Sequence, residues 1–100
     1  MEFGLFVEFP SREGTTQAQI FKDSMELIEA AEESGSEGIW LAEYHFDPGR
    51  SVLSAPVTVA GAVAARTKRV KIGLAVHVLP LRNPIQIAEE IATLDHLSDG

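Results

Sequence analysis

Glu43, Tyr44 and His45 place a carboxylate, a phenol and an imidazole directly after a short apolar run, which is bulky enough for a strand buried on both faces. Such groups can move protons, orient one another by hydrogen bonds or hold a polar ligand. Two further apolar runs end in the same way, one in Glu8 and one in His77. The working residues of parallel α/β proteins lie at the carboxyl ends of strands. We therefore expect these side chains to share one edge of a sheet.

The elements that would position these residues recur along the chain. Strand candidates begin near residues 2, 38 and 70, and a recurrence of about 30 to 35 residues is typical of a βα unit. Helical patterns lie between them, and Thr16, Ser54 and Asn83 are predicted N-caps because a short polar side chain can accept a free backbone N–H. Gly35 can end the first helix in a left-handed conformation. The order βαβαβα predicts a parallel sheet with the loops after its strands on one side.

Two architectures use such units, the open doubly wound sheet and the (β/α)8 or TIM barrel. A doubly wound dinucleotide site needs a glycine-rich turn after the first strand, and residues 8–14 lack that pattern. We therefore predict the α/β fold of a (β/α)8 TIM barrel. Three units cannot close a barrel, so that we expect residues 1–100 to be the N-terminal part of a single barrel domain, supplying roughly its first three βα units.

The composition restricts the class of protein. A net charge of −7 argues against a nucleic-acid partner, because binding phosphates requires a basic face. The chain has no cysteine, which excludes disulfides and thiolate chemistry, and its three histidines show no metal-ligand spacing. We see neither a signal peptide nor an apolar run of membrane-spanning length, and therefore expect a cytoplasmic protein without a membrane partner.

Four stretches occur in a fixed order and spacing: MEFGLF (1–6), GIWLAEYHF (38–46), VKIGLAVHVLPLRNP (70–84) and LDHLSDG (94–100). In these stretches the chain resembles the bacterial luciferase-like flavin-dependent monooxygenases, and the resemblance covers all 100 residues. It implies a (β/α)8 barrel that uses reduced FMN and O2 to oxidise a small organic substrate. Two alternatives stay open: an F420-dependent oxidoreductase of the same superfamily, and a non-catalytic flavin-binding protein.

The resemblance also implies roles for individual residues. It suggests a catalytic group made of His45, Tyr44 and Glu43. It suggests a cofactor-binding group made of Glu43, Ala75, Val76 and His77, with no metal.

Two details of the resemblance concern single positions. The family carries a cis peptide bond that falls here between Ala75 and Val76. In its light-emitting members the position of Tyr44 is a histidine. A phenol, with a pKa of about 10, cannot shuttle protons near pH 7, so we expect chemistry other than light emission.

The resemblance further implies the partners of the protein. They are a small-molecule substrate and a flavin reductase that supplies reduced flavin. A second copy is expected to form a dimer through the second and third helices. Small residues around Gly61 would allow that close approach.

Overall fold

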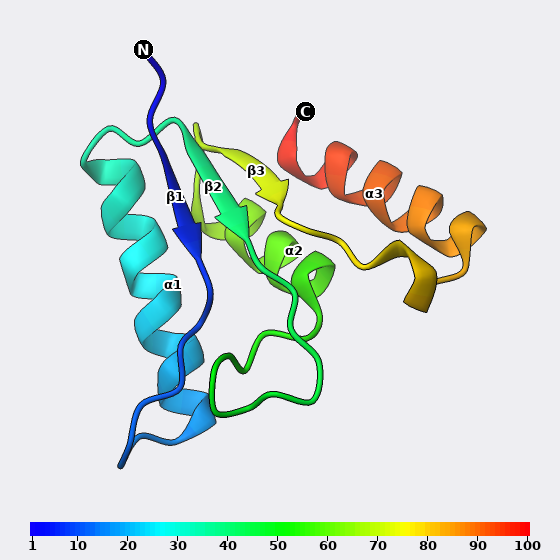
Figure 1. Cartoon of the computed structure of the whole chain (residues 1–100). Helices are drawn as coiled ribbons and strands as arrows, with labels where there is room; N and C mark the ends of the chain where they lie inside the picture. The colour runs from blue at the N-terminus through cyan, green and yellow to red at the C-terminus, as the bar shows by residue number, and fades with distance from the viewer.

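The computed structural model describes residues 1–100, in which three strands alternate with three α-helices (Figure 1). The elements are β1 (Gly4–Val7), α1 (Gln17–Glu33), β2 (Gly38–Leu41), α2 (Pro56–Arg66), β3 (Lys71–Leu74), the single 3-10 turn η1 (Leu79–Leu81) and α3 (Pro84–Ser98). This order confirms the predicted βαβαβα arrangement. None of the helices is long and apolar enough to cross a membrane.

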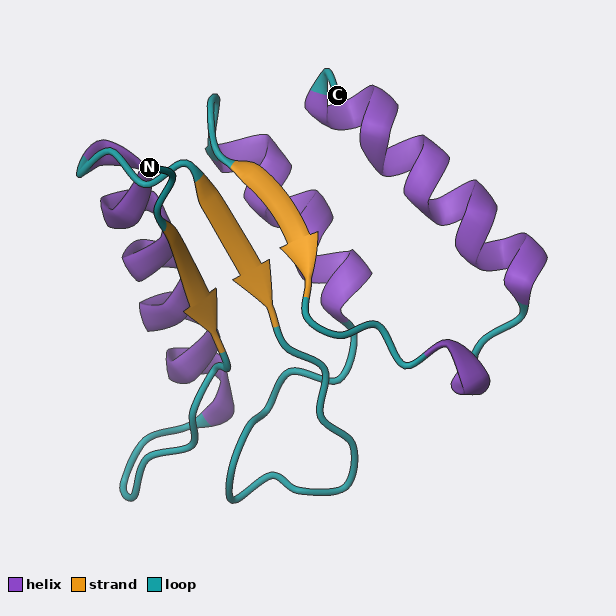
Figure 2. Cartoon of the chain, turned by 45° about the horizontal axis from the view of Figure 1, so that its top comes forward, coloured by secondary structure: helices purple, strands orange, loops and turns teal.

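The three strands form one parallel sheet in the order β1-β2-β3, and α1 and α2 cover the same face of it (Figure 2). Side chains alternate between the two faces of a strand. Ile39 and Leu41 of β2 therefore point together into the layer between sheet and helices, where both are fully buried. They form the core with apolar residues of α1 and α2, among them Ile28 and Val63.

The opposite face of the sheet is open in this chain. Phe6 and Trp40, which are paired in register across β1 and β2, are 50% and 49% exposed. The prediction that β2 is buried on both faces is thus wrong for these residues. The reason is that both covering helices lie on one side, while α3 packs on α2 beyond the β3 edge and has no buried residue.

Trp40 lies across glycines of the two neighbouring strands. A Cβ atom built on Gly73, its register partner on β3, would be 2.3 Å from the indole Cε3 atom. A Cβ on Gly4 of β1 would be 3.0 Å from the indole Nε1 atom. Glycine at these positions lets the indole lie close to the sheet. The glycines of β1 and β3 therefore make room for the Trp40 side chain of β2.

We expect Gly73→Val to destabilise the full-length protein by about 1–3 kcal/mol, as overpacking does. Valine is the better strand residue, so intrinsic propensity predicts the opposite sign. Chemical denaturation of the variant measures the loss of free energy of unfolding. In the double variant Gly73→Val, Trp40→Val the clash is absent and much of the loss should be recovered. Equal losses in the single and double variants would contradict this account.

The helix ends agree with most of the predicted caps. The Thr16 hydroxyl accepts the backbone N–H of Gln19 at 3.2 Å, Asn83 caps α3, and Gly35 has a φ of +95°. Ser54 was wrong as an N-cap: the cap of α2 is Ala55, with no side-chain hydrogen bond. The helix begins at Pro56, which places Ser54 one residue too early to reach a free N–H of the first turn.

The opposite end of β3 is held by one carboxylate of α1. Glu32 accepts the backbone N–H groups of Lys68, Arg69 and Val70 at 2.9, 2.6 and 3.0 Å. Burial opposes the charge of Glu32, but these three hydrogen bonds outweigh it and lower its pKa below 4.5. The contact fixes the entry into β3 at the edge of the sheet away from the predicted site.

Candidate active site

The loops after β1 and β2 lie side by side at the carboxyl edge of the sheet. Ser11 N–H donates to the Arg50 carbonyl at 3.2 Å, and Val52 N–H donates to the Phe9 carbonyl at 3.1 Å. The Ser51 hydroxyl donates to the Glu8 carbonyl. These hydrogen bonds hold the two loops together at the edge of the sheet where we expected the titratable side chains.

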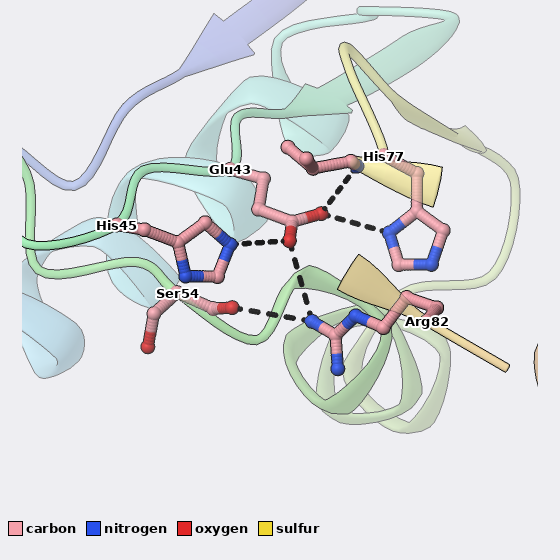
Figure 3. Close-up of polar contacts among 6 residues, drawn as sticks. Glu43, His45, Ser54, His77 and Arg82 are labelled. Atoms are coloured by element: carbon pink, nitrogen blue, oxygen red, sulfur yellow. Dashed lines mark hydrogen bonds and ion pairs between the residues drawn. The ribbon is translucent and has the colours of Figure 1, made fainter. Parts of the chain in front are cut away.

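Glu43 is the centre of the largest polar cluster at this edge (Figure 3). Its Oε1 atom lies 2.5 Å from His45 Nε2 and 3.3 Å from Arg82 Nη2. Its Oε2 atom lies 2.8 Å from His77 Nδ1 and 2.9 Å from the backbone nitrogen of Val78. The Glu43 side chain is completely buried. The segments that follow β2 and β3, and Arg82 just before α3, therefore meet at one carboxylate.

The Glu43 carboxylate is ionised at neutral pH. Burial alone would raise its pKa, but the hydrogen bonds from Val78, His45, His77 and Arg82 outweigh burial and lower the pKa from 4.5 to about 2. Arg82 supplies the opposite charge, and its Nη2 atom also lies 3.4 Å from the Ser54 carbonyl just before α2. The negative charge of the buried Glu43 carboxylate is thus balanced by the Arg82 guanidinium.

An ionised carboxylate only accepts hydrogen bonds, which fixes the donors around it. His45 must donate from Nε2 and His77 from Nδ1. In neutral His77 the Nε2 atom then carries a lone pair, and this atom is buried without a hydrogen-bond partner. The Nε atom of Arg82 is likewise buried and unpartnered. Glu43 thus determines which ring nitrogen of His77 carries the proton when this imidazole is neutral.

Tyr44 belongs to a second, separate cluster. Its hydroxyl donates to Glu8 Oε1 at 2.7 Å, and Arg50 Nη2 donates to the same oxygen at 2.8 Å. The Arg50 guanidinium lies 4.8 Å from the centre of the Tyr44 ring. The hydrogen bond from Arg50 has the largest effect on Glu8 and, together with that from Tyr44, lowers the pKa of Glu8. The hydrogen bond to Glu8 in turn raises the pKa of Tyr44. Tyr44 is therefore a neutral hydrogen-bond donor near pH 7.

The structure brings some of the predicted site residues together and separates others. Glu43, His45 and His77 are in direct contact, whereas Tyr44 contacts Glu8 instead. The expected cis bond joins Ala75 and Val76 directly after β3. No group of three or more His, Cys, Asp or Glu side chains is placed to hold a metal ion.

Arg82, Glu8 and Arg50 complete the two clusters: Glu8 is among the side chains expected at this edge, whereas the two arginines are not among the predicted site residues. All three lie at a strand end or in the loop after a strand, and that position was the available signal. Alternation along an extended chain offered a second one, because residues i and i+2 share a side and residue i+1 does not. It would have grouped Glu43 with His45 and set Tyr44 apart.

A parallel sheet with polar clusters at the carboxyl ends of its strands defines the class: an α/β protein built from successive βα units. Comparison with known proteins then identifies the family. The family described as luciferase-like monooxygenase matches the chain over residues 1–100. The chain belongs to the luciferase-like monooxygenase family.

Individual relatives agree with this assignment. The chain is 37% identical over 100 residues to the alkanal monooxygenase beta chain of Photorhabdus laumondii, and 33% identical to limonene 1,2-monooxygenase of Rhodococcus erythropolis. All of this chain is matched, but it spans only 31% and 26% of the lengths of these relatives.

Solved structures show the same fold. Monooxygenase RslO1 from Streptomyces bottropensis matches the whole chain with a TM-score of 0.90 and 31% identity, over 31% of its own length. The oxygenating constituent of 3,6-diketocamphane monooxygenase from Pseudomonas putida, a type II Baeyer–Villiger enzyme solved with FMN, matches with a TM-score of 0.91 and 25% identity, over 27% of its length. These matches confirm that the chain folds as the first three βα units of a luciferase-like TIM barrel.

Proposed function

We propose that the full-length protein is a flavin-dependent monooxygenase that uses reduced FMN and O2 to oxidise a small organic substrate. One observation carries the proposal: the Glu43 network holds His45 and His77 at the carboxyl edge of the sheet, next to the segment Ala75–Val76. Family membership supports a monooxygenase, and the relative from Pseudomonas putida was solved with FMN.

The residues present fit a flat, partly apolar ring system. Phe6 and Trp40 present aromatic surface on the open face of the sheet, and Val76 is 68% exposed. We propose that Ala75, Val76 and His77 form the part of the flavin site contributed by this chain. When bound, reduced FMN would supply the electrons that activate O2. Apolar walls would keep water away from the reacting groups.

The polar residues of the chain would serve this site in different ways. His45 and Tyr44 are our candidates for contact with substrate or flavin, and each is held by a carboxylate behind it. Tyr44, as a neutral donor, can hold an oxygen atom but cannot exchange protons rapidly near pH 7. Substrates that need an oriented carbonyl or hydroxyl group suit this arrangement.

The test is a set of turnover assays on the full-length protein. Reduced FMN, supplied by a flavin reductase, should give substrate-dependent O2 consumption with aldehydes, ketones or terpenes. Reduction of F420 without O2 uptake would instead show an F420-dependent oxidoreductase. Flavin binding without either reaction would show a non-catalytic flavin-binding protein, and both of these results would reject the monooxygenase.

We also propose that the full-length protein forms a dimer through α2 and α3. Ile85 and Leu97 of α3 are 69% and 70% exposed, and Leu97 lines a groove between α2 and α3 together with Gly61. The space around a Cβ atom at Gly61 is open for at least 4 Å within the chain. A neighbouring molecule could therefore approach this position closely.

We expect Gly61→Trp to convert the dimer into monomers, because a bulky side chain would act twice at a two-fold interface. Sedimentation velocity measures the change in mass. Gly61→Ala is the matched control and should leave the dimer intact. A full-length protein that is monomeric from the start, or a tryptophan variant that still dimerises, would place the contact elsewhere.

A further inference from the structure

We infer that Glu43 is a positioning residue, which acts through His77, Val78 and Arg82 and does not itself contact a ligand. With Arg82 as its counter-ion, it holds the segment Ala75–Arg82 in the conformation that presents Ala75 and Val76. The link to flavin rests on the proposed function. The hold on the segment does not, and it can be tested without any ligand.

The first argument is that the carboxylate has no acceptor site to spare. A carboxylate offers about four lone-pair sites, two on each oxygen. His45 and Arg82 occupy Oε1, and His77 and Val78 occupy Oε2. The side chain is also completely buried. A ligand could reach Glu43 only by displacing one of these four donors.

The second argument is that three of the four donors come from a single stretch of chain. His77, Val78 and Arg82 belong to one stretch of chain that begins directly after β3 and includes η1. Its first residue, Ala75, donates its N–H to the Leu41 carbonyl of β2 at 2.8 Å, but further along Val76, Leu79 and Leu81 are 68%, 58% and 58% exposed. Backbone bonds within it join only close neighbours, as from Leu81 N–H to the Val78 carbonyl at 3.1 Å. Glu43 therefore connects the part of the stretch after Ala75 to the end of β2.

The third argument is that Arg82 closes the network from the other side. Its guanidinium bridges Glu43 and the Ser54 carbonyl, so it connects the stretch to the loop that leads into α2. Arg82 and the Val78 N–H can only donate hydrogen bonds, whereas an imidazole can also accept one. This difference allows a variant that weakens the network and a second variant that repairs it.

In Glu43→Gln the side-chain amide has one accepting and one donating end. If its oxygen faces Val78 and His77, its NH2 group faces the guanidinium of Arg82, and two donors oppose each other. Replacing Arg82 by methionine removes that conflict and the uncompensated charge. The glutamine NH2 group can then donate to Nε2 of His45 in its other tautomer. Arg82→Met should therefore rescue Glu43→Gln.

The experiment uses the full-length protein with Glu43→Gln, Arg82→Met and the double variant. Hydrogen–deuterium exchange of peptides covering residues 75–82 reports the hold on the segment, and equilibrium binding of FMN reports its consequence. Glu43→Gln should speed exchange and weaken FMN binding by roughly tenfold or more. The double variant should recover part of both losses relative to Glu43→Gln, because it removes the opposed donors but also loses the contact of Arg82 with the Ser54 carbonyl.

Glu32→Gln is the matched control, since it also removes a carboxylate that accepts backbone N–H groups, but at the opposite end of β3. It should speed exchange at residues 68–70 without changing FMN affinity beyond roughly twofold. A general loss of stability would make it behave like Glu43→Gln, and that result would overturn the inference.

Two other results would also overturn it. Unchanged exchange in Glu43→Gln would show that the segment is held by other contacts. Restored exchange without restored FMN affinity in the double variant would show that the carboxylate itself touches the flavin. If the original protein binds no FMN while exchange still responds as expected, the proposed function fails and the positioning role stands.

Discussion

Replacing Glu43 by alanine is expected to lower the free energy of unfolding of the full-length protein by about 3 kcal/mol or more, the scale found when one partner of a buried ion pair is removed. The variant leaves the Val78 N–H without its acceptor, removes a fully buried carboxylate and deprives the partly exposed Arg82 guanidinium of its counter-ion. Chemical denaturation followed by circular dichroism measures the loss. The same change should reduce turnover or flavin affinity by at least roughly tenfold.

Glu8→Ala provides the comparison for this result. Glu8 also accepts two side-chain hydrogen bonds, but it is 32% exposed, so that water can replace the lost contacts of Tyr44 and Arg50. Its effect on stability should be clearly smaller than that of Glu43→Ala. Losses of equal size would show that burial does not distinguish the two clusters. His45→Ala should resemble Glu43→Ala in turnover but not in stability, because it removes only one of the four donors.

The course of the chain could be predicted from the sequence because its signals are local. Apolar runs locate the three strands, and Thr16, Gly35 and Asn83 act on backbone groups within a few residues of themselves. Ser54 shows the limit of such rules, since a shift of one residue at the start of α2 removes the cap. The position of the site follows from parallel strand order, which brings the strand ends to one edge.

The pairing within the site could not be predicted, because the partners are far apart in sequence. Glu43 meets Arg82 across 39 residues, and Glu8 meets Arg50 across 42. Nothing in either local sequence indicates which carboxylate receives which cation. The exposure of Trp40 was missed for a related reason: burial of the second face depends on which elements cover it, and α1 and α2 both cover the first.

The lowered pKa of Glu43 predicts a loss of stability in acid. The folded protein holds Glu43 ionised down to a pKa of about 2, whereas an unfolded chain protonates the same group near 4.5. Between these values the unfolded state binds more protons, so falling pH favours unfolding. The contribution is present above pH 4.5 and is lost as the pH approaches 2. The shift corresponds to about 3 kcal/mol in total, of which about 2 kcal/mol should disappear between pH 5 and pH 3.

The Glu43→Gln variant isolates this contribution because glutamine does not titrate. Glu8 and Glu32, whose pKa values are also lowered, titrate in both proteins and cancel in the comparison. Denaturation at pH 5 and at pH 3 should therefore give a larger loss for the original protein than for the variant. At pH 3 the two stabilities should differ less than at pH 5, because the unfolded chain has protonated Glu43 whereas the folded protein still holds it ionised. Parallel pH profiles would mean that Glu43 is not held as an ion in the folded protein, and the network of His45, His77 and Arg82 would then need another explanation.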